Sequence, residues 1–208
     1  MSGAIHLTDR SEVIVRTIAS PSTNPRSTCF DGRHYWHSDS SSDLIYKLDR
    51  LGNRIKSFTS PDPNPRSIAF NGRHILLGVF SGASPGIYIY DVNFNLIRFR
   101  SLPVPDTDTA GITFDGRHYY IVDNNNDLIK KRDPLNNLIR SYATPASSTR
   151  GICFNGRHNY TYDNADGLLR KLRSNGDLIQ AIDTLSFAYR DISFDGRYLI
   201  ITQEEEGI

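Results

Sequence analysis

Short apolar runs alternate with polar turns along the whole chain, and the alternation is periodic. The clearest marker is a phenylalanine followed by Asx-Gly-Arg, which occurs five times. Successive markers are roughly 40 residues apart, and a period of that size is typical of repeat architectures. The pattern therefore predicts five copies of one structural unit. The marker phenylalanines are Phe30, Phe70, Phe114, Phe154 and Phe194.

The third unit shows how one repeat is expected to fold. An Asp-Gly pair separates the apolar run 111–114 from a second run, 118–122. Asx-Gly between two such runs favours a β-hairpin, and we expect a type I′ turn, which needs positive φ at both central residues. Two further strands follow, near 128–131 and 138–142, and no segment carries the apolar stripe of a helix. Four antiparallel strands per repeat are typical of a propeller blade.

The repeats are offset from the start of the chain. The pattern from Asp9 to Arg26 recurs one repeat later, from Asp49 to Arg66, so the chain begins inside a unit and ends just past the second strand of the last one. We expect N-terminal strands near 4–9 and 13–18 to complete the blade begun by strands near 191–194 and 198–202, which would leave few exposed edges. The predicted fold is all-β: a five-bladed β-propeller of four-stranded antiparallel blades, its last blade closed by N-terminal strands, in a single domain over residues 1–208.

Three segments of the repeat carry a family resemblance. They read NPRSIAFNGRH at 64–74, DNNNDLI at 123–129 and DPLNNLI at 133–139. The pattern is similar to the NHL, YVTN and gluconolactonase-like propeller repeats, and it extends over the whole chain. The resemblance implies a propeller but not one function, because such folds carry binding proteins and enzymes alike. The metal-ligand pattern of the gluconolactonases and the inner-strand acidic residues of five-bladed glycosidases are not found here.

Charge and cysteine usage narrow the classes of partner. The 24 basic and 23 acidic residues leave a net charge of +1, so no overall field attracts nucleic acid or an anionic membrane, and neither partner is expected. No signal sequence or membrane-spanning stretch is found. Cys29 and Cys153 occupy the same slot in units one and four, too far apart in a ring for a disulfide. Free thiols favour a cytoplasmic location.

Four arginines precede innermost strands and are the first candidate ligand-binding residues. They are Arg26, Arg66, Arg150 and Arg190, with Ala110 in the same slot of unit three. Innermost strands line the axis of a propeller, so the arginines could ring one mouth of the channel and bind a carboxylate or phosphate bidentately. Alternatively, each arginine pairs with a nearby aspartate or an exposed carbonyl between blades.

Paired aspartates in the loops between second and third strands are the other candidate ligand-binding residues. Asp39 with Asp43, and Asp123 with Asp127, flank polar loops on the same face as the arginines. Carboxylates at this spacing could supply some calcium ligands, but Asx turns explain them more simply. We therefore expect no metal and no cofactor.

The similarity of the five units favours repeated binding sites over one asymmetric active site. We expect a non-enzymatic binding or interaction propeller, lectin-like or protein-binding, with quasi-equivalent sites for a protein or glycan ligand. Two alternatives stay open: a structural propeller that self-associates into a filament or lattice, and a lyase or hydrolase with its site at the channel mouth. The insertion in unit two, 80–86, marks either function or drift.

Overall fold

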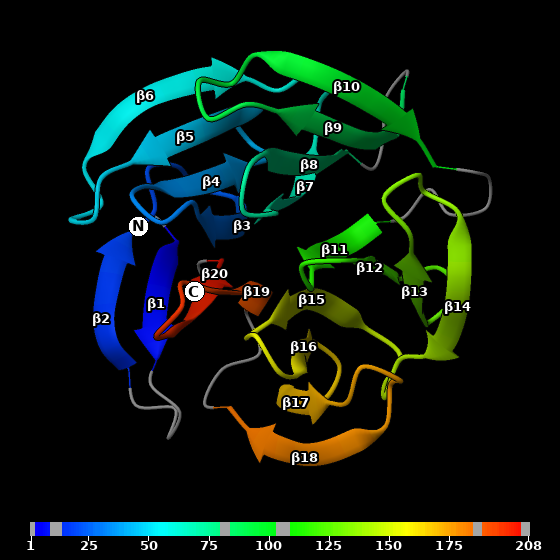
Figure 1. Ribbon diagram of the computed structural model, residues 1–208. Helices are drawn as coiled ribbons and strands as arrows, with labels where there is room; N and C mark the ends of the chain where they lie inside the picture. The colour runs from blue at the N-terminus through cyan, green and yellow to red at the C-terminus, as the bar shows by residue number, and fades with distance from the viewer. Residues whose placement is uncertain (1–2, 9–13, 80–83, 103–108, 185–188, 205–208) are drawn as a thin grey trace.

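The computed structural model describes residues 3–8, 14–79, 84–102, 109–184 and 189–204. Within these ranges the chain forms twenty strands in five four-stranded sheets, which stand around a central axis (Figure 1). The predicted all-β, five-bladed propeller is confirmed. No helix in the same ranges could cross a membrane. Part of the unit-two insertion, residues 80–83, lies outside the described residues.

Each blade runs from an innermost strand at the axis to an outermost strand at the rim (Figure 1). Blade 1 consists of β3 (Pro25–Phe30), β4 (Tyr35–Asp39), β5 (Leu44–Leu48) and β6 (Arg54–Thr59); blade 2 of β7 (Pro65–Phe70), β8 (Ile75–Val79), β9 (Gly86–Tyr90) and β10 (Leu96–Ser101); blade 3 of β11 (Thr109–Phe114), β12 (Tyr119–Asp123), β13 (Leu128–Arg132) and β14 (Leu138–Ala143); blade 4 of β15 (Thr149–Phe154), β16 (Asn159–Asp163), β17 (Leu168–Leu172) and β18 (Leu178–Asp183); and blade 5 of β19 (Tyr189–Phe194), β20 (Leu199–Gln203), β1 (Ala4–Thr8) and β2 (Ile14–Ala19).

Blade 5 joins the two ends of the chain. Strand β1 pairs antiparallel with β20, with Ile5 opposite Thr202 and Leu7 opposite Ile200. Figure 1 shows both chain ends, N and C, beside this sheet. The predicted closure of the last blade by N-terminal strands is therefore confirmed. It ties the first and last units together through backbone hydrogen bonds as well as side-chain packing.

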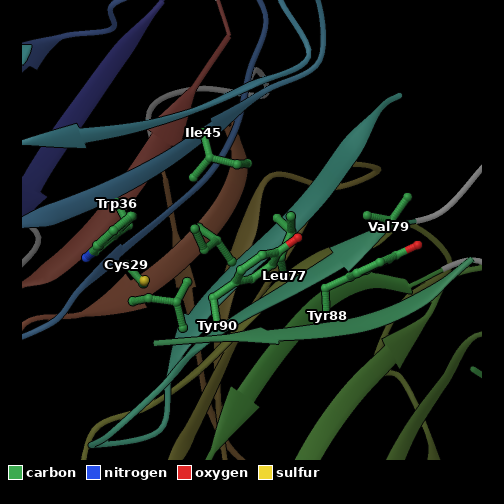
Figure 2. Packing of buried hydrophobic residues seen from close by; sticks show 9 residues of the cluster. Cys29, Trp36, Ile45, Leu77, Val79, Tyr88 and Tyr90 are labelled. Atoms are coloured by element: carbon green, nitrogen blue, oxygen red, sulfur yellow. The ribbon is translucent and has the colours of Figure 1, made fainter. Parts of the chain in front are cut away.

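The hydrophobic core lies between blades rather than in one central mass. Five clusters of buried side chains each join two neighbouring blades. Between blades 1 and 2, the fully buried Trp36 packs with Cys29 and Ile45 against Leu77 and Tyr90 (Figure 2). A blade cannot bury both faces alone, so each depends on its neighbours.

The hairpin turns between first and second strands differ from the predicted type I′. Asp31 does not have positive φ, whereas Gly32 does, so positive φ is confined to the first of the central residues Gly32 and Arg33, as in a type II′ turn. The Asp31 carboxylate accepts hydrogen bonds from the backbone amides of Arg33 and His34 at 2.8 and 2.6 Å. The Asx side chain therefore caps the turn, while the Asx residue itself comes before the two central residues. The equivalent glycines, Gly32, Gly72, Gly116, Gly156 and Gly196, all have φ between +89° and +96°.

Candidate functional site

The innermost strands β3, β7, β11, β15 and β19 surround the central channel, and each contacts its neighbours around the ring (Figure 1). One level of the channel is formed by five buried residues, Ser27, Ser67, Gly111, Gly151 and Asp191. The strands approach closely there: a Cβ added at Gly151 would lie 2.5 Å from Asp191 Oδ1, and one at Gly111 would lie 3.1 Å from the Gly151 Cα. We name this part of the channel, which lies between the pockets at the two mouths, the closed level.

Asp191 is an acidic side chain buried at the closed level. Its Oδ2 hydrogen-bonds to Ser27 Oγ across the junction between blades 5 and 1. Burial raises the pKa of Asp191 well above its ordinary value, against the opposing effect of the hydrogen bond from Ser27 and those from the Ile192 and Thr28 amides. Sequence reasoning missed this residue. The signal that could have found it is one acidic residue in a slot that otherwise holds serine or glycine.

At one mouth, a pocket is lined by Arg26, Arg66, Ala110, Arg150 and Arg190. The structure thus brings together the four arginines singled out in the sequence, and no acidic residue is among the described residues that line the pocket. Burial and then the charges of Arg26, Arg150 and Arg66 lower the pKa of Arg190 to about 10. The guanidinium groups therefore lie close enough to repel one another, and we name this pocket the arginine mouth.

The arginines differ in how they are held. Arg26 Nε donates a hydrogen bond to Ser40 Oγ at 2.6 Å, and Arg190 forms an ion pair with Glu204. The Nε of Arg150 is buried and has no hydrogen-bond partner among the described residues. Arg26 is thus held by a hydrogen bond and Arg190 by an ion pair, although the Nε of Arg190, like that of Arg150, has no hydrogen-bond partner among the described residues.

Two of the predicted aspartates have structural roles. Asp39 Oδ1 accepts hydrogen bonds from the backbone amides of Ser41 and Ser42, both at 3.0 Å, and Oδ2 accepts one from the Asn24 amide at 2.9 Å. Asp123 binds its own loop in the same way and also pairs with the buried Lys130. These bonds occupy the carboxylate oxygens that a ligand would need.

The other two predicted aspartates end the same loops. Asp43 and Asp127 have positive φ, 54° and 51°, and their carbonyl oxygens accept hydrogen bonds from the Ser60 and Thr144 amides. None of the four aspartates lines the arginine mouth. Within the described ranges, no cluster of three or more His, Cys, Asp or Glu residues could hold a metal ion.

A pocket at the opposite mouth was not predicted. It contains the marker phenylalanine of every unit, together with Cys29, Cys153, Thr113 and Ser193. Both cysteines are free and buried, as expected, and burial raises the pKa of each thiol well above its ordinary value. Neither sulfur therefore has the thiolate character of a nucleophile. The phenylalanines around this mouth are Phe30, Phe70, Phe114, Phe154 and Phe194.

Comparison with known proteins supports the fold and corrects the expected function. No family model matches the chain, and no curated protein matches it in sequence. A glutaminyl cyclase from Myxococcus xanthus has a similar solved structure, with a TM-score of 0.74 and 9% identity over 96% of this chain and 89% of that one. This neighbour is an enzyme, so the expectation of a non-enzymatic binding propeller is wrong. At this identity the likeness itself shows the fold alone.

The channel is not five-fold symmetric, although the five units that enclose it are similar in sequence. Ala110 interrupts the arginine mouth, and Asp191 stands alone in the closed level among serines and glycines. An asymmetric polar site is therefore compatible with repeated blades, contrary to the expectation from the repeat. The expected protein or glycan partner stays a prediction.

Proposed function

We propose that this protein is an enzyme whose active site is the arginine mouth and whose substrate carries a carboxylate or phosphate group. The observation that supports it is the convergence of four guanidinium groups on one pocket, with the pKa of Arg190 lowered by burial and by the other arginines. An anion bound there would relieve that repulsion. Guanidinium groups bind carboxylates and phosphates through two parallel hydrogen bonds.

The same arrangement suits a hydrolase or a lyase. In both reaction classes negative charge develops in the transition state, and fixed positive groups in a partly desolvated pocket stabilise it. Arg150, whose Nε is unpaired, is our candidate for this contact. Ala110 leaves one side of the ring without a long side chain, so the uncharged part of the substrate would lie there.

The name of the similar structure suggests a second activity to assay, the cyclisation of glutaminyl substrates. The arginine mouth favours anions over the ammonium group of a peptide N-terminus, because like charges repel. We therefore expect glutaminyl peptides to be poorer ligands than carboxylates or phosphates. The resemblance of the repeats to NHL-like families supports the fold of this proposal and not its substrate.

The test uses Arg150→Gln, because that side chain makes no hydrogen bond in the described structure that the substitution would break. Thermal unfolding is followed with citrate, inorganic phosphate and a glutaminyl peptide, and stabilising compounds are then assayed for turnover by NMR. One charged hydrogen bond contributes roughly 1.5–3 kcal/mol, so the anion affinity should fall at least about tenfold. The melting temperature without ligand should not fall, because a repulsive charge is removed.

Arg117→Gln is the matched control. Arg117 is an exposed arginine of the blade 3 hairpin, at the opposite end of its blade from the arginine mouth. It should bind the anion as the parent does. The proposal is wrong if Arg150→Gln binds anions as tightly as the parent, or if a glutaminyl peptide alone is turned over and Arg150→Gln leaves that turnover unchanged.

A further inference from the structure

A separate pocket lies in blade 4, at the end opposite the arginine mouth. It is lined by Asn155, Arg157, His158, Tyr160 and Lys171. The first three belong to the hairpin turn after β15, and Tyr160 stands directly opposite Lys171 in the register of β16 and β17. We name this pocket, together with the adjoining Arg173, the blade 4 corner.

The equivalent corner of blade 3 is balanced by carboxylates. There Asp115 accepts a hydrogen bond from the Tyr120 hydroxyl at 3.0 Å and lies 3.4 Å from His118 Nδ1. The Lys131 ammonium lies over the Tyr120 ring, 5.3 Å from its centroid. A second carboxylate, Asp133, begins the turn that follows β13. The cations Arg117 and Lys131 therefore have two carboxylates near them at this corner, while Arg140 stands opposite Lys131 in the register of β13 and β14.

Blade 4 differs from blade 3 in charges of both signs at the equivalent positions, since Leu172 and Gln180 stand in place of Arg132 and Arg140. Asn155 replaces the aspartate of the hairpin, Arg173 replaces the aspartate of the next turn, and Asp177 replaces an asparagine. Arg173 and Asp177 form an exposed ion pair at 3.7 Å, a type of contact worth little in water. The corner holds three cations, Arg157, Lys171 and Arg173, against one carboxylate.

The three cations of the blade 4 corner act on His158. Desolvation of the His158 ring, followed by the charges of Lys171, Arg157 and Arg173, lowers the pKa of His158 below its ordinary value. Among the described residues, the Lys171 amino group has no hydrogen-bond or ion-pair partner. By contrast, Lys47, at the same position in blade 1, donates to the Val92 carbonyl at 3.1 Å.

We propose that the blade 4 corner binds a tetrahedral oxyanion, a phosphate or sulfate group. Two cationic side chains, Arg157 and Lys171, line one pocket, and the Asn155 amide and Tyr160 hydroxyl, 3.4 Å apart, add neutral polar groups at its wall. The charge of Arg173 also acts on His158 in this pocket. Phosphate and sulfate share the geometry that arginine and lysine recognise together. This site is distinct from the arginine mouth, because β15 runs from Arg150 near one end to Asn155 just past the other.

The test titrates the intact protein with inorganic phosphate and, separately, with sulfate at low ionic strength, while backbone and histidine NMR signals are recorded. We expect shifts at residues 155–160 and 171–173, and a rise in the pKa of His158 when phosphate is bound. If only phosphate binds, the ligand is a phosphoryl group; if both bind, the site recognises tetrahedral anions in general. Shifts confined to the arginine mouth would overturn the inference without touching the proposed active site.

The sharpest variant combines Arg173→Asp with Asp177→Asn. It restores the turn of blade 3, in which Asn137 Nδ2 donates to Asp133 Oδ2 at 2.8 Å, so the fold should be kept. Phosphate affinity should fall at least about tenfold, because an attractive charge becomes a repulsive one.

Lys171→Gln and Lys131→Gln form the matched pair. They remove the same cation from blades 4 and 3, where the two lysines stand opposite Tyr160 and Tyr120 in equivalent registers. Only the blade 4 change should weaken phosphate binding. Unchanged affinity in the double variant, or equal loss in both lysine variants, would overturn the inference.

Discussion

Replacing Asp191 with asparagine tests the closed level of the channel through its effect on the pH dependence of stability. Asparagine keeps the shape of the carboxyl group and cannot ionise. Burial raises the pKa of Asp191 well above its ordinary value of 3.8, so the folded protein holds a proton there that the unfolded chain has lost. Stability from this group is complete below the ordinary pKa and is lost as the pH rises towards the raised one.

The magnitude follows from that difference of one bound proton. Between the two pKa values, each unit of pH lowers the free energy of unfolding of the parent by about 1.4 kcal/mol. The Asp191→Asn variant does not lose this free energy. Its free energy of unfolding should therefore rise relative to that of the parent by the same amount for each pH unit within that window.

A buried histidine makes the free energy of unfolding rise with pH, which is the opposite of the effect of Asp191. His37, in β4, lies between the hydroxyls of Ser20 and Thr28 at 3.1 and 2.8 Å, and burial lowers its pKa to about 4. Because the unfolded histidine takes up a proton below about 6.5, stability rises with pH between about 4 and 6.5. The two slopes oppose each other in the parent within that range.

Urea unfolding of parent and variant from pH 3 to 8 separates the two groups. The difference between the two curves cancels His37, which both proteins share, and isolates Asp191. We expect the difference to be small near pH 3 and to widen as the pH rises. Parallel curves across the whole range would refute a protonated carboxyl at the centre of the ring.

The fold makes three further predictions. Gly116→Ala should lower the free energy of unfolding by about 1–2 kcal/mol through its φ of +93° alone, since no atom lies within 4 Å of the added Cβ. Gly151→Ala should lower it more, because its Cβ would lie 2.6 Å from a backbone nitrogen. Urea unfolding of the two variants checks this order. Deletion of residues 1–19 removes β1 and β2 and should cost an amount similar to the whole net stability, about 5–15 kcal/mol, so a truncated protein that stays monomeric in size exclusion and melts like the parent would contradict the closure. The buried thiols Cys29 and Cys153 should react with a thiol reagent only after denaturation; rapid reaction of the native protein would count against their burial.

The blades could be predicted because each strand and turn is specified locally. The Asx-Gly hairpins, the alternating apolar positions and the turn residues all act within a single repeat. The convergence of Arg26, Arg66, Arg150 and Arg190 followed from their common place before the innermost strands. The prediction of a type I′ turn was wrong because the Asx side chain accepts hydrogen bonds from the backbone amides that follow it, which the residue types alone did not reveal.

The remaining features depend on contacts between distant units. Asp191 meets Ser27 from the far side of the ring closure, 164 residues away, so no local pattern marks it as buried. The blade 4 corner depends on three substitutions spread over 155–177, each of which looks like ordinary drift when read alone. Only the register of β16 with β17 shows that Tyr160 and Lys171 stand side by side.

Blade 5 can close only after almost the whole chain has been synthesised. Strand β1 is synthesised roughly 190 residues before its partner β20, which corresponds to about 10–40 s at 5–20 residues per second. Throughout that interval β1 can pair only with β2, so Ile5 and Leu7, which are buried in the finished ring, lack the cover that β20 provides. Single substitutions that weaken the pairing of β1 with β20 should thus reduce the yield of folded protein more than they reduce the melting temperature of the molecules that close.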